Sequence, residues 1–198
     1  TLQATAPHIH IDIVPLSADI AHMLESGEAD LAIGFMPQLE AGFYQTVLFD
    51  QTFVCMVSAN HPRIRDELTL QHFGSESHAV ISSSGAAPLL IDQEIARLGL
   101  QRKISLRIPN FIGAALVVEH TDLIITIPAR LGDVLQGRGA LRTFTVPFQL
   151  PQYAVKQHWH ERYHNDPGTR WLRRVIAELM TPTPSASVPG GPAHPDRP

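Results

Sequence analysis

Polar and β-branched residues alternate near the start of the chain, and this pattern predicts a strand. Residues 8–14 follow a period of two, which puts successive side chains on opposite faces of a sheet. Ser17 then precedes apolar residues at helical spacing, so we expect a helix that Ser17 caps and Gly27 ends. Residues 29–35 are interpreted as a short buried strand. The order strand, helix, strand requires a crossover, which favours parallel pairing and the α/β class.

The same alternation of strands and helices continues to residue 180. Further strands are expected at residues 48–57, 79–82, 104–108, 123–127, 144–146 and 153–159. Further helices are expected at residues 88–98, 111–119, 130–135 and 169–180. Two blocks of this kind predict two α/β subdomains of similar plan. Residues 181–198, by contrast, hold 6 of the 16 prolines and no apolar periodicity, so we expect a disordered tail there.

The composition is typical of a soluble protein with a hydrophobic core. Of the 198 residues, 44% are hydrophobic and 17% are charged, which excludes wholesale disorder. The net charge of −4 makes binding of nucleic acid or anionic lipid through a general basic surface a poor candidate function. Apolar runs are far shorter than the roughly 20 residues of a membrane span, and no signal-peptide pattern is seen. We therefore expect a cytoplasmic protein with no membrane partner.

Motifs that carry catalysis are missing from the sequence, so we expect neither an enzyme nor a bound cofactor. The chain has no Gly-x-Ser-x-Gly, no Gly-x-Gly-x-x-Gly and no lysine-containing phosphate loop. Cys55, the single cysteine, lies in an apolar strand and is interpreted as a buried, inert thiol. His158, His160 and His164 suggest a metal site, but no defined fourth ligand accompanies them, so ordinary histidines are the favoured interpretation.

A turn rich in hydroxyl groups is the strongest sign of a ligand site. Ser82, Ser83, Ser84 and Gly85 join a strand to a helix start, where the helix dipole favours an anion. A serine-rich cap without a ligand explains the same residues. Ligands of open α/β folds bind at the carboxyl ends of strands. Other residues at such ends are Leu16, Ser17, Met36, Gln51, Thr52, Phe111 and Ile112, with Arg130 at the next helix start.

The chemical class of the expected ligand follows from this mixture of side chains. One arginine among apolar and hydroxyl groups suits a small aromatic carboxylate better than a sugar or a nucleotide. Arg130 is the residue that would bind the carboxylate, and a structural salt bridge is the alternative role for its side chain.

Short motifs are distributed along the chain in a characteristic order. They are Gly-Glu-Ala-Asp-Leu-Ala-Ile-Gly at 27–34, Asn-His-Pro at 60–62, Arg-Leu at 130–131, Trp-His-Glu-Arg at 159–162, Asp-Pro at 166–167 and Trp-Leu-Arg at 171–173. Together they resemble the effector-binding domain of LysR-type transcriptional regulators, and the resemblance covers residues 7–180. Residues 37–44 and 121–123 are similar to the branch that senses salicylate-like and nitroaromatic compounds.

The resemblance implies a fold with two α/β subdomains joined by two crossover segments, as in type 2 periplasmic binding proteins, with a small effector in the cleft. The expected division is residues 1–76 with 152–180, and residues 77–150. Both sheets are expected to be mainly parallel, with crossings near residues 76–78 and 147–152. By the family pattern, this chain lacks the N-terminal DNA-binding domain and also the first strand and helix of the effector domain.

The resemblance also implies partners. The family pattern is a homo-oligomer, a dimer that becomes a tetramer in the full-length regulator and contacts DNA only through the N-terminal domain. The helix at residues 17–27 and the strand near Leu48 are the candidate dimer surface. A solute-binding protein of a transport system shares the fold and is the alternative function. A hydrolase or metalloenzyme built on the three histidines fails for want of a nucleophile–base pair.

Overall fold

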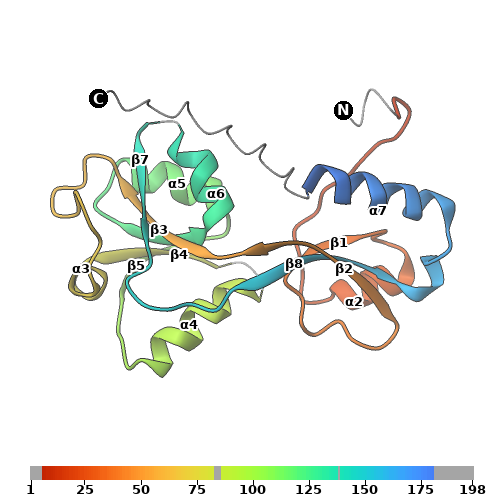
Figure 1. Ribbon diagram of the computed structural model, residues 1–198, viewed down its shortest axis with the longest axis horizontal. Helices are drawn as coiled ribbons and strands as arrows, with labels where there is room; N and C mark the ends of the chain where they lie inside the picture. Colours follow the sequence, from red (N-terminus) through yellow and green to blue (C-terminus); the bar gives the residue numbers. More distant parts are fainter. Residues whose placement is uncertain (1–5, 83–85, 138, 181–198) are drawn as a thin grey trace, which may run out of the picture.

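Two lobes, each built around its own β-sheet, make up the computed structural model (Figure 1). The structure describes residues 6–82, 86–137 and 139–180. In chain order the elements are α2 (Ile20–Ser26), β1 (Ala32–Gly34), β2 (Phe43–Gln51), β3 (Phe53–Ser58), α3 (Leu70–Ser75), β4 (Ser77–Ile81), α4 (Ala87–Arg97), β5 (Lys103–Ile108), α5 (Phe111–Glu119), β6 (Ile124–Pro128), α6 (Ala129–Gln136), β7 (Leu141–Thr145), β8 (Tyr153–His160), the 3-10 helix η1 (Glu161–Tyr163) and α7 (Pro167–Met180).

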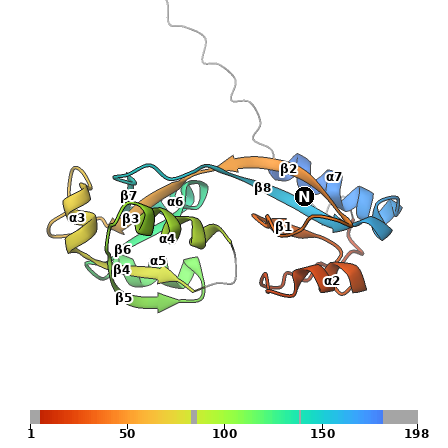
Figure 2. The ribbon, with the colours of Figure 1, turned by 90° about the horizontal axis from the view of Figure 1, so that it is seen from below.

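The smaller lobe contains a three-stranded sheet in the order β1-β8-β2. Both outer strands run antiparallel to β8. Figure 2 shows α2 on one side of this sheet and α7 on the other. Ile20 and Leu24 of α2 are buried in the core of this lobe. The helix ends at Gly27, whose φ of 83° lies in the left-handed region that favours glycine.

The larger lobe contains a five-stranded sheet in the order β5-β4-β6-β3-β7. Successive residues of a strand point to opposite faces, and the two faces of β3 have different partners. Cys55 packs on the α4 side with Ile91 and Ile95. Met56 packs on the other side with Ala114 of α5 and Leu135 of α6. The larger sheet is therefore covered by helices on both faces, as a mixed α/β sheet requires.

The expectation of mainly parallel sheets is wrong for the smaller lobe and half right for the larger one. Only β4 pairs in parallel, with β5 and with β6. β3 runs antiparallel to β6 and β7. The reason is that a strand arriving from the other lobe enters the sheet without a local helical crossover, which removes the constraint that makes neighbours parallel.

The first crossing between lobes also differs from the expectation. β2 ends at Gln51 and β3 begins at Phe53 in the other sheet, so the chain changes lobe at Thr52 and not near residues 76–78. The expected single strand over residues 48–57 is in fact the end of one strand and the start of another. The return crossing runs from β7 to β8, through residues 146–152.

Two local expectations near the start of the chain are wrong. Residues 8–14 form no strand and are exposed, because the described residues provide no hydrogen-bonded neighbour for them. Ser17 is not the cap of α2: the cap position is Asp19, which makes no side-chain cap hydrogen bond. The Ser17 hydroxyl instead accepts a hydrogen bond from the Asp19 N–H at 3.2 Å. The expected tail at residues 181–198 lies outside the described residues.

The sequence predicts α4, α5, α6 and α7 closely, because their local signals are strong. α4 begins with a proline at its first turn, where a missing N–H costs nothing. α5 spans the predicted residues 111–119, and the Asn110 side chain caps it by accepting a hydrogen bond from the Gly113 N–H at 2.7 Å. The short helix α3 was not predicted, since only six residues form it.

Candidate functional site

A cavity lies in the larger lobe between α4 and the five-stranded sheet, towards the carboxyl ends of β4 and β6. It is lined by Phe53, Ala79, Val80, Ile81, Ala87, Pro88, Ile91, Asp92, Arg102, Arg107, Phe111, Thr126 and Pro128. Most of the walls are apolar or aromatic. The volume is about 40 Å³, enough for roughly three water molecules. A ligand as large as an aromatic ring enters only if the lining elements move apart.

Two arginines give the cavity its positive charge. The Arg102 side chain is only 10% exposed, and its Nη2 forms an ion pair with Asp92 Oδ1. Burial lowers the pKa of Arg102, and the charge of Asp92 opposes that shift. Arg107 lies on β5 and is exposed. A buried guanidinium beside apolar walls can bind a carboxylate through charge-assisted hydrogen bonds.

Cys55, the single cysteine of the chain, lies beside this cavity, and its thiol is unreactive at neutral pH. Cys55 Sγ lies 3.6 Å from the hydroxyl oxygen of Thr126, which lines the cavity. Burial raises the pKa of the Cys55 thiol to about 12, and the contact with Thr126 opposes that shift. A thiol that stays protonated is a poor nucleophile, so the arrangement around the cavity suits binding.

Of the predicted serine turn, the structure describes only Ser82. Ser82 is exposed, and its backbone N–H donates to the Ile108 carbonyl at 2.9 Å. Ser83, Ser84 and Gly85 lie outside the described residues. Ala86 follows them at the cap position of α4 and has no side chain that could cap the helix. Phe111 lines the cavity as expected for a site residue, whereas Ile112 is 54% exposed and is not among the lining residues.

The structure places Arg130 away from this cavity. Its guanidinium lies over the ring of Phe49, 3.9 Å from the centroid, and donates to the Met180 carbonyl at 3.2 Å. Gln51 is buried, and its Oε1 accepts hydrogen bonds from the Thr52 N–H at 3.1 Å and the Arg130 N–H at 3.4 Å. These residues join β2, the start of α6 and the end of α7. Their contacts are those of a structural junction.

The three remaining predicted site residues belong to the smaller lobe. Met36 is buried in its core, and Leu16 packs against that core. The Ser17 hydroxyl contacts Met23 Sδ at 3.5 Å. None of these three side chains lines the cavity of the larger lobe.

Sequence reasoning missed Arg102, Arg107 and Asp92 as cavity residues. Arg107 had a usable signal, because it alternates with Leu106 and Ile108 along a predicted strand and so faces the opposite side of the sheet. Arg102 had none: it lies just before that strand in a polar stretch, and only the fold turns its side chain inward.

The larger part of the chain matches a known family model. That model describes the LysR substrate binding domain, and it matches residues 1–181. This chain belongs to the LysR substrate-binding domain family. The HTH-type transcriptional activator NagR of Ralstonia sp. is 34% identical over 181 residues, which are 91% of this chain and 60% of NagR. The chain therefore spans less than two thirds of that relative.

Solved structures agree with this family. A putative transcriptional regulator from Vibrio parahaemolyticus superposes with a TM-score of 0.81 at 30% identity, covering 89% of this chain and 82% of that one. The regulatory domain of MexT, a transcriptional activator in Pseudomonas aeruginosa, gives a TM-score of 0.78 at 26% identity, covering 89% and 88%. The LysR domain thus has two α/β subdomains joined by crossover segments, the type 2 periplasmic-binding-protein-like fold. These relatives are regulators, so a transport function finds no support.

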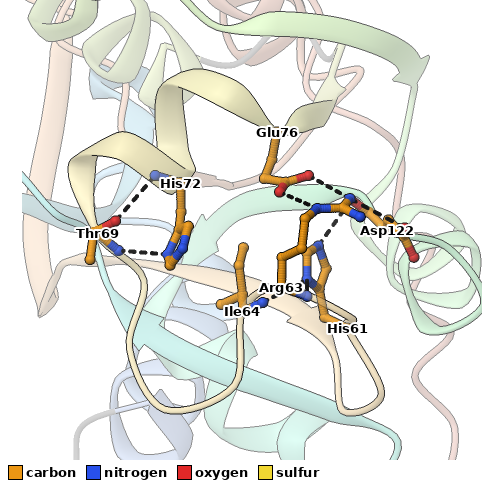
Figure 3. Close-up of polar contacts among 7 residues, drawn as sticks. All are labelled: His61, Arg63, Ile64, Thr69, His72, Glu76 and Asp122. Atoms are coloured by element: carbon orange, nitrogen blue, oxygen red, sulfur yellow. Dashed lines mark hydrogen bonds and ion pairs between the residues drawn. The ribbon is translucent and has the colours of Figure 1, made fainter.

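The Asn-His-Pro motif of this LysR domain organises a polar cluster in the larger lobe (Figure 3). The buried His61 ring accepts hydrogen bonds at Nδ1 from the N–H groups of Arg63 at 3.2 Å and Ile64 at 3.0 Å. Because Nδ1 is an acceptor, the proton is on Nε2, which donates to the Asp122 carbonyl at 3.2 Å. The Arg63 Nε and Nη2 donate to the two carboxylate oxygens of Glu76 at 2.5 and 2.8 Å.

This polar cluster is satisfied internally, so its role is structural. The hydrogen bonds from Arg63 lower the pKa of Glu76, although burial opposes that shift. The cluster ties the segment between β3 and β4 to the loop before β6.

Two histidines of the C-terminal group in the LysR domain make local hydrogen bonds, and the third is buried. His158 is buried in β8. His160 Nδ1 accepts a hydrogen bond from the Arg162 N–H, and His164 Nδ1 accepts one from Trp159 Nε1, both at 3.3 Å. Across the described ranges, no group of three or more metal-ligating side chains comes together. Likewise, no helix in the described part of the chain is long and apolar enough to cross a membrane.

Proposed function

We propose that this LysR domain is an effector sensor that binds a small aromatic acid and thereby controls transcription from DNA. The observation that carries the proposal is the cavity in the larger lobe, which lies towards the carboxyl ends of β4 and β6. It combines aromatic walls with two guanidinium groups, that of Arg107 near the carboxyl end of β5 and that of Arg102 just before β5. Ligands of open α/β sheets bind at such edges. The inert thiol beside the cavity fits a domain that binds its ligand without transforming it.

The chemistry of the cavity supports the ligand class. Phe53, Phe111 and Pro88 offer flat apolar surface for a ring, and burying a ring contributes about 1.5–3 kcal/mol. A carboxylate on that ring gains a charge-assisted hydrogen bond worth about 1.5–3 kcal/mol. A neutral amide of the same shape keeps the first contribution and loses much of the second.

Calorimetry tests this ligand class directly. Salicylate and benzoate are titrated into the chain and compared with salicylamide and benzamide. We expect each acid to bind at least roughly tenfold more tightly than its amide, a difference of about 1.4 kcal/mol. Equal affinity for acid and amide would contradict an anion site.

We also propose a cytoplasmic regulator that works as a dimer, and as a tetramer when a DNA-binding segment is attached. The support is β2, which is an outer strand of the smaller sheet and exposes Tyr44 and Val47. Exposed apolar residues on a free edge favour pairing with a second copy. Sedimentation should show a dimer that Val47→Glu dissociates; a monomer at high concentration of the unaltered chain would contradict this surface.

A further inference from the structure

One ion pair lies at the wall of the cavity and joins α4 to the segment before β5. Asp92 of α4 supplies one oxygen to one nitrogen of Arg102. The two side chains differ sharply in burial, because the Asp92 side chain is 56% exposed and the Arg102 side chain is 10% exposed. A guanidinium carries five N–H donors in a planar fork, and a carboxylate that meets it edge-on can accept two of them. Asp92 therefore uses Arg102 incompletely.

We propose that Asp92 occupies the place of the effector's carboxylate, and that an aromatic acid binds by exchanging with Asp92 on Arg102. This proposal rests on the proposed function and names the residue that selects for the charge of the ligand. In the bound state the effector's carboxylate receives the N–H groups of Arg102, and Asp92 turns to solvent, where half of its side chain already lies.

The size of the cavity supports an exchange over a simple addition. A volume of about 40 Å³ does not hold a six-membered ring. The cavity is bounded by α4 on one side, through Ala87, Pro88 and Ile91. Moving α4 outward enlarges it, and the same movement draws Asp92 away from Arg102. A buried guanidinium without a partner is costly, and the incoming carboxylate removes that cost.

The competing explanation is that the ion pair merely stabilises α4. The same helix supplies a control for this explanation. Glu94 Oε2 pairs with Arg97 Nε at 2.7 Å, three residues apart, and neither residue lines the cavity. Removing that pair changes the charge and the stability of α4 without touching the proposed exchange.

Calorimetry with benzoate and benzamide on the full chain separates the two explanations. In Asp92→Asn, which loses the competing carboxylate, we expect benzoate to bind about threefold to tenfold more tightly while thermal stability without ligand falls slightly. In Arg102→Gln we expect benzoate to bind at least roughly tenfold more weakly, with benzamide affinity within about twofold of the wild type. Glu94→Gln and Arg130→Ala should leave both affinities within about twofold.

Three results would overturn the exchange. The first is weaker benzoate binding in Asp92→Asn, because the loss of a merely stabilising ion pair would lower affinity and stability together. The second is an unchanged preference for benzoate over benzamide in a folded Arg102→Gln, which would assign the anion to Arg107. Asp92→Asn carries the test if Arg102→Gln does not fold, since Asp92 is largely exposed. The third is a wild-type chain that binds neither compound, which would overturn the proposed function as well.

Discussion

Replacing His61 with phenylalanine isolates the contribution of its hydrogen bonds, because the ring is kept and its nitrogens are lost. The His61 side chain is fully buried. Three backbone groups lose their partner: the N–H groups of Arg63 and Ile64, and the carbonyl of Asp122. A buried polar group without a partner costs about 1–3 kcal/mol. The Ile64 N–H is the most deeply buried of the three, so counting it fully and the others in part gives a loss of about 3–4 kcal/mol.

Urea unfolding at pH 7.5 measures this loss as a change in the free energy of unfolding. The control is His72→Phe, since His72 Nδ1 also accepts a backbone N–H, that of Thr69 at 3.3 Å, but at a half-buried helix start. We expect the control to lose about 1 kcal/mol or less. A loss below about 1 kcal/mol for His61→Phe at an unchanged denaturant slope, or equal losses in both variants, would refute the assignment of these hydrogen bonds.

Three other predictions concern stability. Gly27→Ala should lose about 2–3 kcal/mol in urea unfolding, because φ is 83° and the new Cβ would clash with Tyr163 Oη. The double variant with Tyr163→Phe should recover part of this loss, and no recovery would mean that backbone strain alone acts. Gly132→Ala should lower the free energy of unfolding by about 1–3 kcal/mol, since its Cβ would lie 2.7 Å from a methyl group of β3. An unchanged urea midpoint would contradict that close packing. Burial lowers the pKa of His78 and of His158 below the usual 6.5, so the unfolded chain takes up protons at a higher pH than the folded chain does. The free energy of unfolding should therefore fall as pH drops below about 6.5, by up to about 1.4 kcal/mol per pH unit for each histidine. A free energy of unfolding that stays constant between pH 7.5 and 5 would contradict the burial of these histidines in the neutral form.

The elements that the sequence predicts well are those whose partners are close in the chain. The sequence predicts α5 to the residue, because a capping asparagine, a run of apolar residues and the polar end of that run lie within a dozen positions. The crossing at Thr52 has no such signal. Residues 48–57 form one apolar run, and nothing in that run says that Gln51 pairs with Tyr153 while Phe53 pairs with Pro128. Sheet membership is decided by contacts about 75 to 100 residues away, which a local pattern does not contain.

The sequence predicts some of the residues that line the cavity, such as Phe111, but places Arg130 among them where the structure has Arg102 and Arg107. Strand ends and the aromatic Phe111 follow from local rules. The choice between Arg130 and Arg102 depends instead on which way a side chain turns after its backbone is placed. Arg130 has an aromatic ring, Phe49, within reach, and a carbonyl at the end of α7. Among the described residues, the partner of the Arg102 side chain is Asp92. The partners of Arg130 come from segments that are distant in the sequence, so a local pattern does not reveal them.

The inert thiol of Cys55 has a practical consequence for labelling experiments. It is the single cysteine of the chain, it is fully buried, and burial raises its pKa to about 12. Thiol-reactive dyes need an accessible thiolate. A cysteine introduced on the surface will therefore be labelled while Cys55 stays unlabelled, and Cys55 need not be replaced. Energy transfer between copies labelled in this way can report their association in an otherwise unaltered protein. The slow modification of Cys55 in the same sample then measures the rate at which α4 opens from the five-stranded sheet, because Cys55 packs on that face with Ile91 and Ile95 and a reagent reaches the sulfur only when the helix moves away.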